Sequence, residues 1–327
     1  MRIGRLSPAT ATFRGGLATA SVIGCAAFSA VSGSSVATAV TIGRVALPEM
    51  KRLGYGDGLS TGSIAAGGTL GFLIPPSTGF VIYAILTEES IGRLFMAGIL
   101  PGLLMMALFT AAIWIVTLRD PAAGPKGAPV ALAQRLRLLL RALPLIAIIV
   151  ISIGGIYIGV FTPVEASGIG AGLSILLALV TRAIDTAGLT RAIMETVKTS
   201  AMLYMIVIGA HVLNPFLALT DIPNALGRGL DYLGLGAYGT LLVIILSYIV
   251  LGMFLDGLAM LVITVPIYYP VILALGFDPI WFGVVAVIVI EMGMITPPVG
   301  LNVFVVRNVA RNVGLGTVFR GVMPFLL

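Results

Sequence analysis

One pattern of helix-breaking residues occurs twice in this chain, at a constant separation of 222 residues (270 minus 48 and 298 minus 76 both give 222). The recurring residues are prolines and glycines, and the pairs are Pro48 and Pro270, Gly54 and Gly276, Gly71 and Gly293, and Pro75-Pro76 and Pro297-Pro298. Glycine permits backbone conformations with positive φ, and proline removes a hydrogen-bond donor, so both residue types turn or break helices. The chain is therefore predicted to contain two copies of one unit, in which a helical hairpin is followed by a short loop and a broken helix.

The composition indicates a protein that is dissolved in a lipid bilayer. Hydrophobic residues make up 59% of the 327 residues and charged residues only 10%, and the mean hydropathy is +1.12. A soluble domain of this length cannot bury so much apolar surface. The apolar runs are long and lack strand-like alternation, which favours helices over a membrane barrel. The predicted fold class is an all-α polytopic membrane protein.

The net charge of +6 does not indicate a nucleic-acid partner. The basic residues are spread over short loops between apolar runs and do not form one stripe, so they are expected to set the membrane topology. The single cysteine, Cys25, lies inside an apolar run and is expected to be a small core residue.

The first copy is predicted to occupy residues 1–118. Its apolar run at 15–43 is interrupted by Ser32-Gly33-Ser34-Ser35. A single tilted helix is one alternative, but arms of roughly 17 and 8 residues reach only about 25 and 12 Å, short of a ~30 Å bilayer core. A re-entrant hairpin is therefore favoured, and its second arm is expected to extend a little past Arg44. A broken helix at 59–86, interrupted at Pro75-Pro76, and a plain span at 95–118 complete this copy.

Residues 119–236 are expected to form a connecting loop and plain spans at about 144–161, 164–181 and 197–218. The second copy is predicted at 237–327, with a hairpin at 237–273, whose tip lies near Asp256-Gly257, and a broken helix at 279–306. It has no counterpart of the span at 95–118. We therefore expect an incomplete second copy, and a chain that corresponds to an internal piece of a longer subunit.

Lysine and arginine concentrate in alternate loops, as expected for cytoplasmic loops. The basic residues of the predicted cytoplasmic side are Arg14, Arg44, Lys51, Arg52, Arg119, Lys126, Arg135, Arg137, Arg141, Arg182, Arg191, Arg307 and Arg311. The loops near Glu88-Glu89, Thr162-Pro163 and Phe277-Asp278 are poor in them. An odd number of crossings then separates the two copies. They are predicted to have opposite orientations, which is the inverted-repeat architecture of secondary transporters.

The hairpin tip of each copy is expected to face the break of its own broken helix at mid-membrane depth. Hydroxyl groups, free carbonyls and helix C-termini are hard, partly negative ligands that suit Na⁺. Two Na⁺ sites flanking one substrate site are therefore predicted. Close packing of small residues is the structural alternative for Ser32-Gly33-Ser34-Ser35, and the inverted partner makes it less favoured.

Several other polar residues have two open interpretations. Ser77, Thr78 and Asn302, at or just past the breaks, are candidate substrate contacts, and interhelical hydrogen bonds explain them equally well. Glu291 either supports the second break indirectly or makes a buried hydrogen bond. His211 is a candidate proton relay, but a satisfied polar side chain is favoured.

An enzyme is not expected. Ser34 or Ser35 with His211 would offer a protease dyad, but no third residue orients it and the repeat would have no purpose. The sequence contains neither a metal-ligand cluster nor a Walker-type phosphate motif.

The motifs together resemble the large membrane subunit of tripartite ATP-independent periplasmic (TRAP) transporters. The segments that carry the resemblance are RGGLATASVIG from Arg14, SGSSVATAVTIG from Ser32, PEMKRLGYG from Pro48, IPPSTGFVIYAILTEESIGRLFMAGILPG from Ile74, FTPVEASGIGA from Phe161 and GMITPPVGLNVFVV from Gly293. These segments run from Arg14 to Val306, so the resemblance extends over nearly the whole chain. Their combination in this order is more specific than any one motif.

The resemblance implies an elevator-type, Na⁺-coupled importer of organic acids in the bacterial inner membrane. It also implies two partners, a soluble periplasmic substrate-binding protein and a small membrane subunit. By motif match, one Na⁺ site would comprise Ser32, Gly33, Ser34, Ser35, Pro75 and Pro76, and the other Asp256, Gly257, Thr296, Pro297 and Pro298. C4-dicarboxylates, sialic acid and similar carboxylates remain open as substrates. A Na⁺/dicarboxylate symporter without a binding protein, and a non-transporting truncated fragment, remain alternatives.

Overall fold

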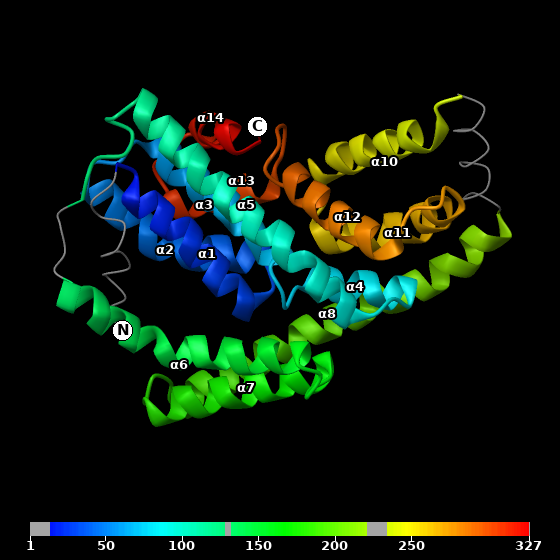
Figure 1. Cartoon of the computed structure of the whole chain (residues 1–327), viewed down its shortest axis with the longest axis horizontal. Helices are drawn as coiled ribbons and strands as arrows, with labels where there is room; N and C mark the ends of the chain where they lie inside the picture. The colour runs from blue at the N-terminus through cyan, green and yellow to red at the C-terminus, as the bar shows by residue number, and fades with distance from the viewer. Residues whose placement is uncertain (1–13, 128–131, 221–233, 327) are drawn as a thin grey trace.

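The computed structural model describes residues 14–127, 132–220 and 234–326, and every regular element in these ranges is an α-helix (Figure 1). The helices are α1 (Gly16–Ser32), α2 (Ser35–Arg52), α3 (Asp57–Leu73), α4 (Thr78–Thr87), α5 (Ile91–Arg119), α6 (Leu132–Tyr157), α7 (Pro163–Val180), α8 (Thr186–Leu219), α10 (Gly236–Gly252), α11 (Gly257–Ala274), α12 (Pro279–Gly293), α13 (Leu301–Ala310) and α14 (Leu315–Leu326). Parts of the predicted copies and of the connecting loop, at 1–13, 128–131, 221–233 and 327, lie outside the described residues.

Several helices are long and apolar enough to cross a membrane. By length and composition these stretches are Asp57–Thr87, Ile91–Arg119, Pro163–Val180, Thr186–Gly209 and Gly257–Ala274. The predicted class of an all-α polytopic membrane protein is confirmed.

The first hairpin turns at Gly33, whose φ of 59° lies in the left-handed region that favours glycine. The sequence places the hairpin at 15–43 and predicts that its second arm extends a little past Arg44, and α2 continues further, to Arg52. Arg44 does not end the helix because its side chain is exposed, and a long basic side chain can leave the apolar layer. Lys51 and Arg52 in the last turn also suit the negative C-terminal end of the helix dipole.

Helix α8 begins at Thr186, eleven residues before the predicted start at 197 (197 minus 186 is 11). The Asp185 carboxylate caps its N-terminus by accepting a hydrogen bond from the Gly188 amide, with an N···O distance of 2.7 Å. The predicted helix was too short because the prediction followed the apolar run. A capped helix can extend beyond such a run with additional polar turns.

Both breaks interrupt a helix within the body of the protein. Residues 74–77 separate α3 from α4, and residues 294–300 separate α12 from α13. The Pro75-Pro76 and Pro297-Pro298 peptide bonds are both cis. Helix α3 is buried along nearly its whole length, because α1, α2, α5, α13 and α14 pack around it.

Two pairs of helix starts lie at the separation seen in the sequence, and two more pairs, α1 with α10 and α4 with α13, come close to it (236 minus 16 is 220 and 301 minus 78 is 223). Helices α2 and α11 begin at Ser35 and Gly257, and α3 and α12 begin at Asp57 and Pro279 (257 minus 35 and 279 minus 57 both give 222). The hairpin α1–α2 thus corresponds to α10–α11, and the broken helix α3–α4 corresponds to α12–α13.

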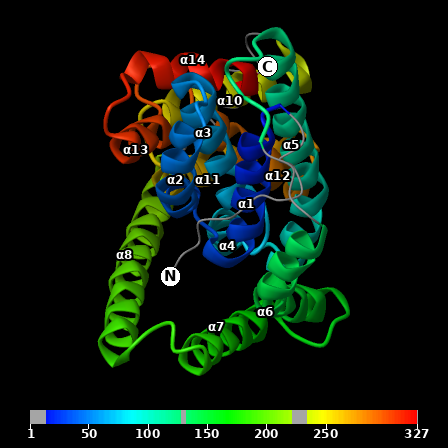
Figure 2. The ribbon, with the colours of Figure 1, turned by 90° about the vertical axis from the view of Figure 1, so that its left-hand side faces the viewer.

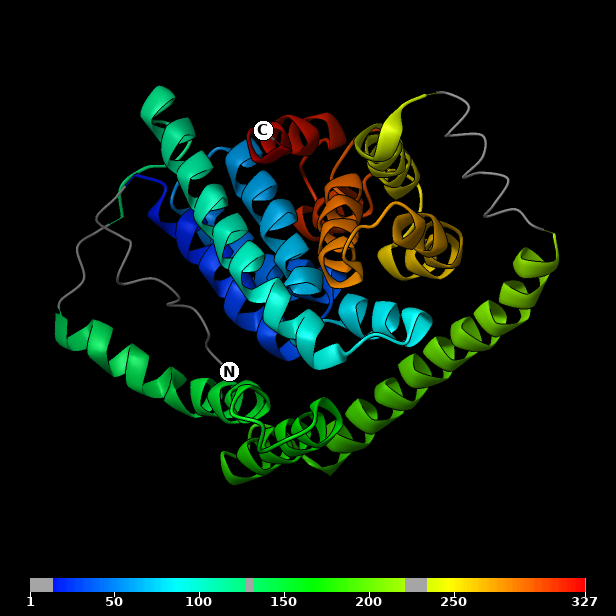
Figure 3. The same ribbon diagram turned by 45° about the vertical axis from the view of Figure 1, so that its right-hand side comes forward.

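The two halves exchange the second parts of their broken helices. Helices α3 and α12 pack on the hairpins that precede them, but α13 packs against α2. Helix α4 packs against α11, as the cyan and gold ribbons of Figure 3 show. Two hydrogen bonds tie the α4 segment to the second half: Tyr83 Oη donates to the Pro279 carbonyl at 2.7 Å, and Tyr269 Oη donates to Glu89 Oε1 at 3.1 Å. Each hairpin therefore contacts both broken helices.

Helices α6, α7 and α8 lie to one side of this body and form an arm that runs along it (Figures 1 and 2). The arm exposes large apolar side chains, among them Val164, Val180 and Leu219, which are 74%, 72% and 87% exposed. Apolar patches of this kind indicate contact with lipid or with another membrane protein.

Candidate functional site

The first hairpin tip contacts the first break directly. A Cβ atom on Gly33 would lie 2.9 Å from the Pro76 carbonyl oxygen, so only glycine allows this approach. Thr78 closes the contact, because its Oγ1 donates to the Gly33 carbonyl at 2.7 Å and its amide lies 3.3 Å from the same oxygen. The structure thus brings Ser32-Gly33-Ser34-Ser35 together with Pro75-Pro76.

Hydroxyl groups gather at this tip. Ser32 Oγ lies 2.8 Å from Thr38 Oγ1, and the Ser34 side chain caps α2 by accepting from the Ala37 amide at 3.4 Å. Ser35 and Thr38 are buried. Sequence reasoning did not single out Thr38, although its position one turn after Ser34 on a helix that starts at the tip is a usable signal.

Ser77 and Thr78 are both engaged in hydrogen bonds within the protein. The Ser77 hydroxyl donates to the Phe72 carbonyl and accepts from the Phe80 amide at 3.3 Å, so it caps α4 and satisfies the broken backbone. Ser77 is only 1% exposed. Ser77 therefore stabilises the backbone at the break between α3 and α4.

The second hairpin meets its break through two glycines. A Cβ atom on Gly293 would lie 2.7 Å from the Gly252 Cα, and the Gly300 amide donates to the Met253 carbonyl at 3.1 Å. The matching residue in the first copy behaves alike, since a Cβ atom on Gly71 would lie 2.5 Å from the Ser34 carbonyl oxygen. Each broken helix therefore approaches its hairpin at the recurring glycine.

Several predicted residues of the second site are exposed or partly exposed to solvent, although Gly257 is buried. Asp256 is exposed and caps α11, accepting from the Leu258 and Ala259 amides at 3.2 and 3.3 Å. Thr296 Oγ1 donates to the Met292 carbonyl at 2.7 Å, and Pro297-Pro298 is exposed. No hydrogen bond joins Asp256 to Thr296 in the described part of the chain, and Gly252 and Met253, which sequence reasoning did not identify, make the contact with the break.

Glu291 and Asn302 are the fully buried polar side chains on either side of the second break. Both are 0% exposed, and neither the Glu291 carboxylate oxygens nor the Asn302 amide atoms have a hydrogen-bond partner. The Glu291 carboxyl lies beside the Ser35 side chain of the first hairpin, although the two do not meet hydrogen-bond geometry. Buried polar groups are nearly always paired, so both residues indicate an interior that can bind a ligand.

Phe72 lies between the start of α4 and the tip of the second hairpin. Its ring would be 2.5 Å from a Cβ atom on Gly79, at the start of α4, and 3.1 Å from one on Gly257, at the start of α11. An apolar ring therefore separates the first break from the second hairpin tip.

Two polar residues of the connecting arm have local roles. A capping box begins α7, since the Thr162 amide donates to Glu165 Oε2 at 2.8 Å and the Glu165 amide donates to Thr162 Oγ1 at 3.2 Å. His211 is exposed on α8, with Nδ1 3.0 Å from the Val207 carbonyl oxygen. No contact joins His211 to Ser34 or Ser35 in the described structure, which gives a protease dyad no support.

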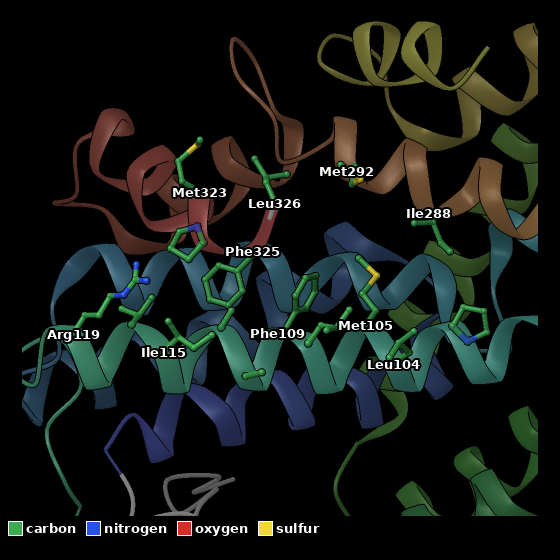
Figure 4. A pocket seen from close by; sticks show the side chains of 16 residues that line it. Leu104, Met105, Phe109, Ile115, Arg119, Ile288, Met292, Met323, Phe325 and Leu326 are labelled. Atoms are coloured by element: carbon green, nitrogen blue, oxygen red, sulfur yellow. The ribbon is translucent and has the colours of Figure 1, made fainter. Parts of the chain in front are cut away.

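An apolar groove of about 800 Å³ lies between α5, α12 and α14 (Figure 4). Leu104, Phe109 and Phe325 line it, and its one charged lining residue is Arg119 at one end. It includes none of the predicted ion or substrate residues. The groove suits hydrocarbon chains, and the polar site lies at the tips and breaks.

Comparison with known proteins identifies the family of this chain. Residues 6–327 match the family described as tripartite ATP-independent periplasmic transporter, DctM component. The chain is 39% identical over 316 residues to the C4-dicarboxylate TRAP transporter large permease protein DctM of Pseudomonas aeruginosa, which covers 96% of this chain and 73% of that protein.

Two further relatives carry other substrate names. The chain is 34% identical over 318 residues to the isethionate TRAP transporter permease protein DctMQ of Oleidesulfovibrio alaskensis, covering 95% of this chain and 49% of that protein. It is 33% identical over 315 residues to the sialic acid TRAP transporter large permease protein SiaM of Vibrio cholerae, covering 96% and 73%. The resemblance inferred from the sequence is confirmed, and this chain belongs to the TRAP transporter family as a large permease component, a transporter and not an enzyme.

Proposed function

We propose that this permease couples the inward movement of Na⁺ to the import of an organic acid across the bacterial inner membrane. The observation that carries the proposal is the contact between the first hairpin tip and the first break. It gathers hydroxyl and carbonyl oxygens where two helices end inside the protein, and such oxygens suit Na⁺.

The two Na⁺ sites would be the two tip-and-break contacts. Ser32, Ser34 and the Gly33 carbonyl would serve the first site together with Pro75 and Pro76, and Ser35 would complete it. Asp256, Gly257, Thr296, Pro297 and Pro298 would serve the second. Gly71 and Gly293 support this pairing, since each brings a broken helix onto its own hairpin.

The substrate would bind between these sites, near Asn302. Its side-chain amide is buried without a partner, so it has both donors and an acceptor for a ligand. Helices α4 and α13 begin directly after the breaks, and the positive ends of their dipoles would attract a carboxylate. The relatives named for C4-dicarboxylate and sialic acid support an organic acid.

The two copies would form an inverted repeat that moves as an elevator. The near-constant separation of the helix starts, 220 to 223 residues (236 minus 16 and 301 minus 78), supports the repeat, and the alternation of basic loops supports opposite orientations. The exchange of α4 and α13 between the hairpins ties both copies into one body that can move as a unit.

The partners would be a periplasmic substrate-binding protein and a small membrane subunit. The exposed apolar side chains of α6, α7 and α8 offer a surface on which a membrane subunit can pack. The relative named permease protein DctMQ is about twice as long as the matched segment, which fits a second membrane component joined to the permease.

Uptake in proteoliposomes tests the proposal. This chain, its small subunit and a binding protein are reconstituted, and uptake of a radiolabelled C4-dicarboxylate or sialic acid is measured with an inward Na⁺ gradient. We expect Ser34→Ala and Thr296→Ala to raise the Na⁺ concentration for half-maximal uptake by about tenfold, equivalent to a loss of about 1.4 kcal/mol of binding energy.

Matched controls are Ser167→Ala and Thr196→Ala on the connecting arm, whose hydroxyls bond only within their own helices. Uptake that proceeds equally without a Na⁺ gradient would contradict Na⁺ coupling. Uptake that persists without the binding protein would favour the self-sufficient symporter.

A further inference from the structure

We propose that Glu291, from the second copy, supplies the negative charge that holds Na⁺ at the first hairpin tip. This inference rests on the proposed Na⁺ coupling and makes it more specific. It means that the first ion site is incomplete without the second broken helix.

The position of Glu291 is the first observation. It lies on α12 two residues before Gly293, yet its carboxyl is beside Ser35, the first residue of α2. Position in the sequence associates Glu291 with the second break, and the packing of α12 against α3 instead brings it to the first tip.

The absence of a partner is the second observation. Glu291 is fully buried, and neither carboxylate oxygen accepts a hydrogen bond. Within the described residues the one ion pair joins Arg52 to Glu49, at the opposite end of α2 from Ser35, so no lysine or arginine neutralises Glu291. A carboxyl group in a medium of low polarity is either protonated or paired with a counter-charge, and a bound cation provides that charge.

The chemistry of the first tip is the third observation. The groups gathered there are hydroxyls and carbonyls, which carry no formal charge. A nearby carboxylate strengthens cation binding far more than another dipole does, because charge–charge attraction is strong where water is excluded. Glu291 therefore converts a neutral set of oxygens into a site with the charge that Na⁺ needs.

Binding of Na⁺ to the purified chain tests the inference without transport. The melting temperature in lipid nanodiscs is followed while NaCl replaces choline chloride at constant ionic strength. We expect Glu291→Gln to weaken the apparent Na⁺ affinity by about tenfold or more, the effect of losing a close opposite charge. The control is Glu195→Gln on α8, an exposed glutamate, which is expected to bind Na⁺ as the wild type does.

Stability without Na⁺ separates this role from a structural one. In Na⁺-free buffer glutamine replaces a carboxyl group that has no partner, so the melting temperature of Glu291→Gln is expected to equal or exceed that of the wild type, whereas the loss of a structural contact would lower it. Glu291→Asp keeps the charge and withdraws it by one methylene, so its Na⁺ affinity is expected between those of wild type and Glu291→Gln. It is the deciding variant if Glu291→Gln does not fold.

The outcomes distinguish the two proposals. A wild-type chain that binds Na⁺, with unchanged affinity in Glu291→Gln or in a deciding Glu291→Asp, overturns the role of Glu291 and leaves Na⁺ coupling intact. A wild-type chain that Na⁺ does not stabilise contradicts both.

Discussion

Gly71 and Gly293 lie at the points where each broken helix crosses its hairpin. A Cβ atom on Gly71 would meet the Ser34 carbonyl group, and one on Gly293 would meet the backbone of Gly252. The nearest atoms that these added Cβ atoms would clash with belong to the backbone, which cannot relieve the clash by changing rotamer as a side chain can. At the scale of single residues, the missing Cβ decides whether the tip and the break can meet.

Gly71→Ala is expected to destabilise the fold by about 1–3 kcal/mol, since it overpacks a rigid contact. The control is Gly24→Ala in α1, where a Cβ atom would have no neighbour within 4 Å and where alanine gains up to about 1 kcal/mol of helix propensity. Thermal unfolding in nanodiscs measures both. Equal melting temperatures for the two variants would contradict the close approach.

Among the elements, the first hairpin and α4 are joined by Thr78. Its hydroxyl and its amide both bond the Gly33 carbonyl, and the Gly300 amide makes the corresponding bond to Met253 in the second copy. These bonds use carbonyls that a helix end leaves free. They hold each tip against its break while α4 and α13 pack on the opposite hairpins.

Thr78→Val is expected to loosen the first tip selectively. The variant keeps the shape of the side chain but loses the hydroxyl bond, worth about 1 kcal/mol. Hydrogen–deuterium exchange of a peptide covering residues 29–38 is expected to accelerate severalfold. Thr110→Val is the control, because the Thr110 hydroxyl bonds only to Met106 in its own helix. Equal exchange rates at the tip in both variants would show that the hydrogen bond from Thr78 to the Gly33 carbonyl does not stabilise it.

The whole molecule combines a body of two exchanged copies with a peripheral arm. If the copies are inverted, Lys51 at the base of the first hairpin and Asp278 after the second must face opposite sides of the membrane. Both side chains are exposed or partly exposed in the structure, and Cys25 is fully buried.

Single cysteines in a Cys25→Ala background test this topology. Lys51→Cys is expected to react with a membrane-impermeant maleimide from the cytoplasmic side, and Asp278→Cys from the periplasmic side, because the basic loops remain inside. Ala65→Cys, at a fully buried position, serves as the unreactive control. Labelling of Lys51→Cys and Asp278→Cys from the same side would exclude the inverted repeat.

Sequence reasoning identified local features well. The turn at Ser32 to Ser35 and the breaks at Pro75-Pro76 and Pro297-Pro298 are where the structure has them, because glycine and proline act on the backbone within a few residues. Helix lengths were less accurate. The predicted span at 197–218 followed the apolar run, whereas α8 begins at Thr186 with polar turns.

By itself, the sequence determined the all-α membrane class, the positions of the breaks, the spacing of the two copies and the family. Only the tertiary structure decided that α4 and α13 pack on the opposite hairpins, that Phe72 separates the first break from the second hairpin tip and that Glu291 lies beside Ser35. The physical reason is that helices apolar on every side carry no periodic signal for their partners. Their neighbours are chosen by close packing between segments far apart in the chain, which no local pattern records.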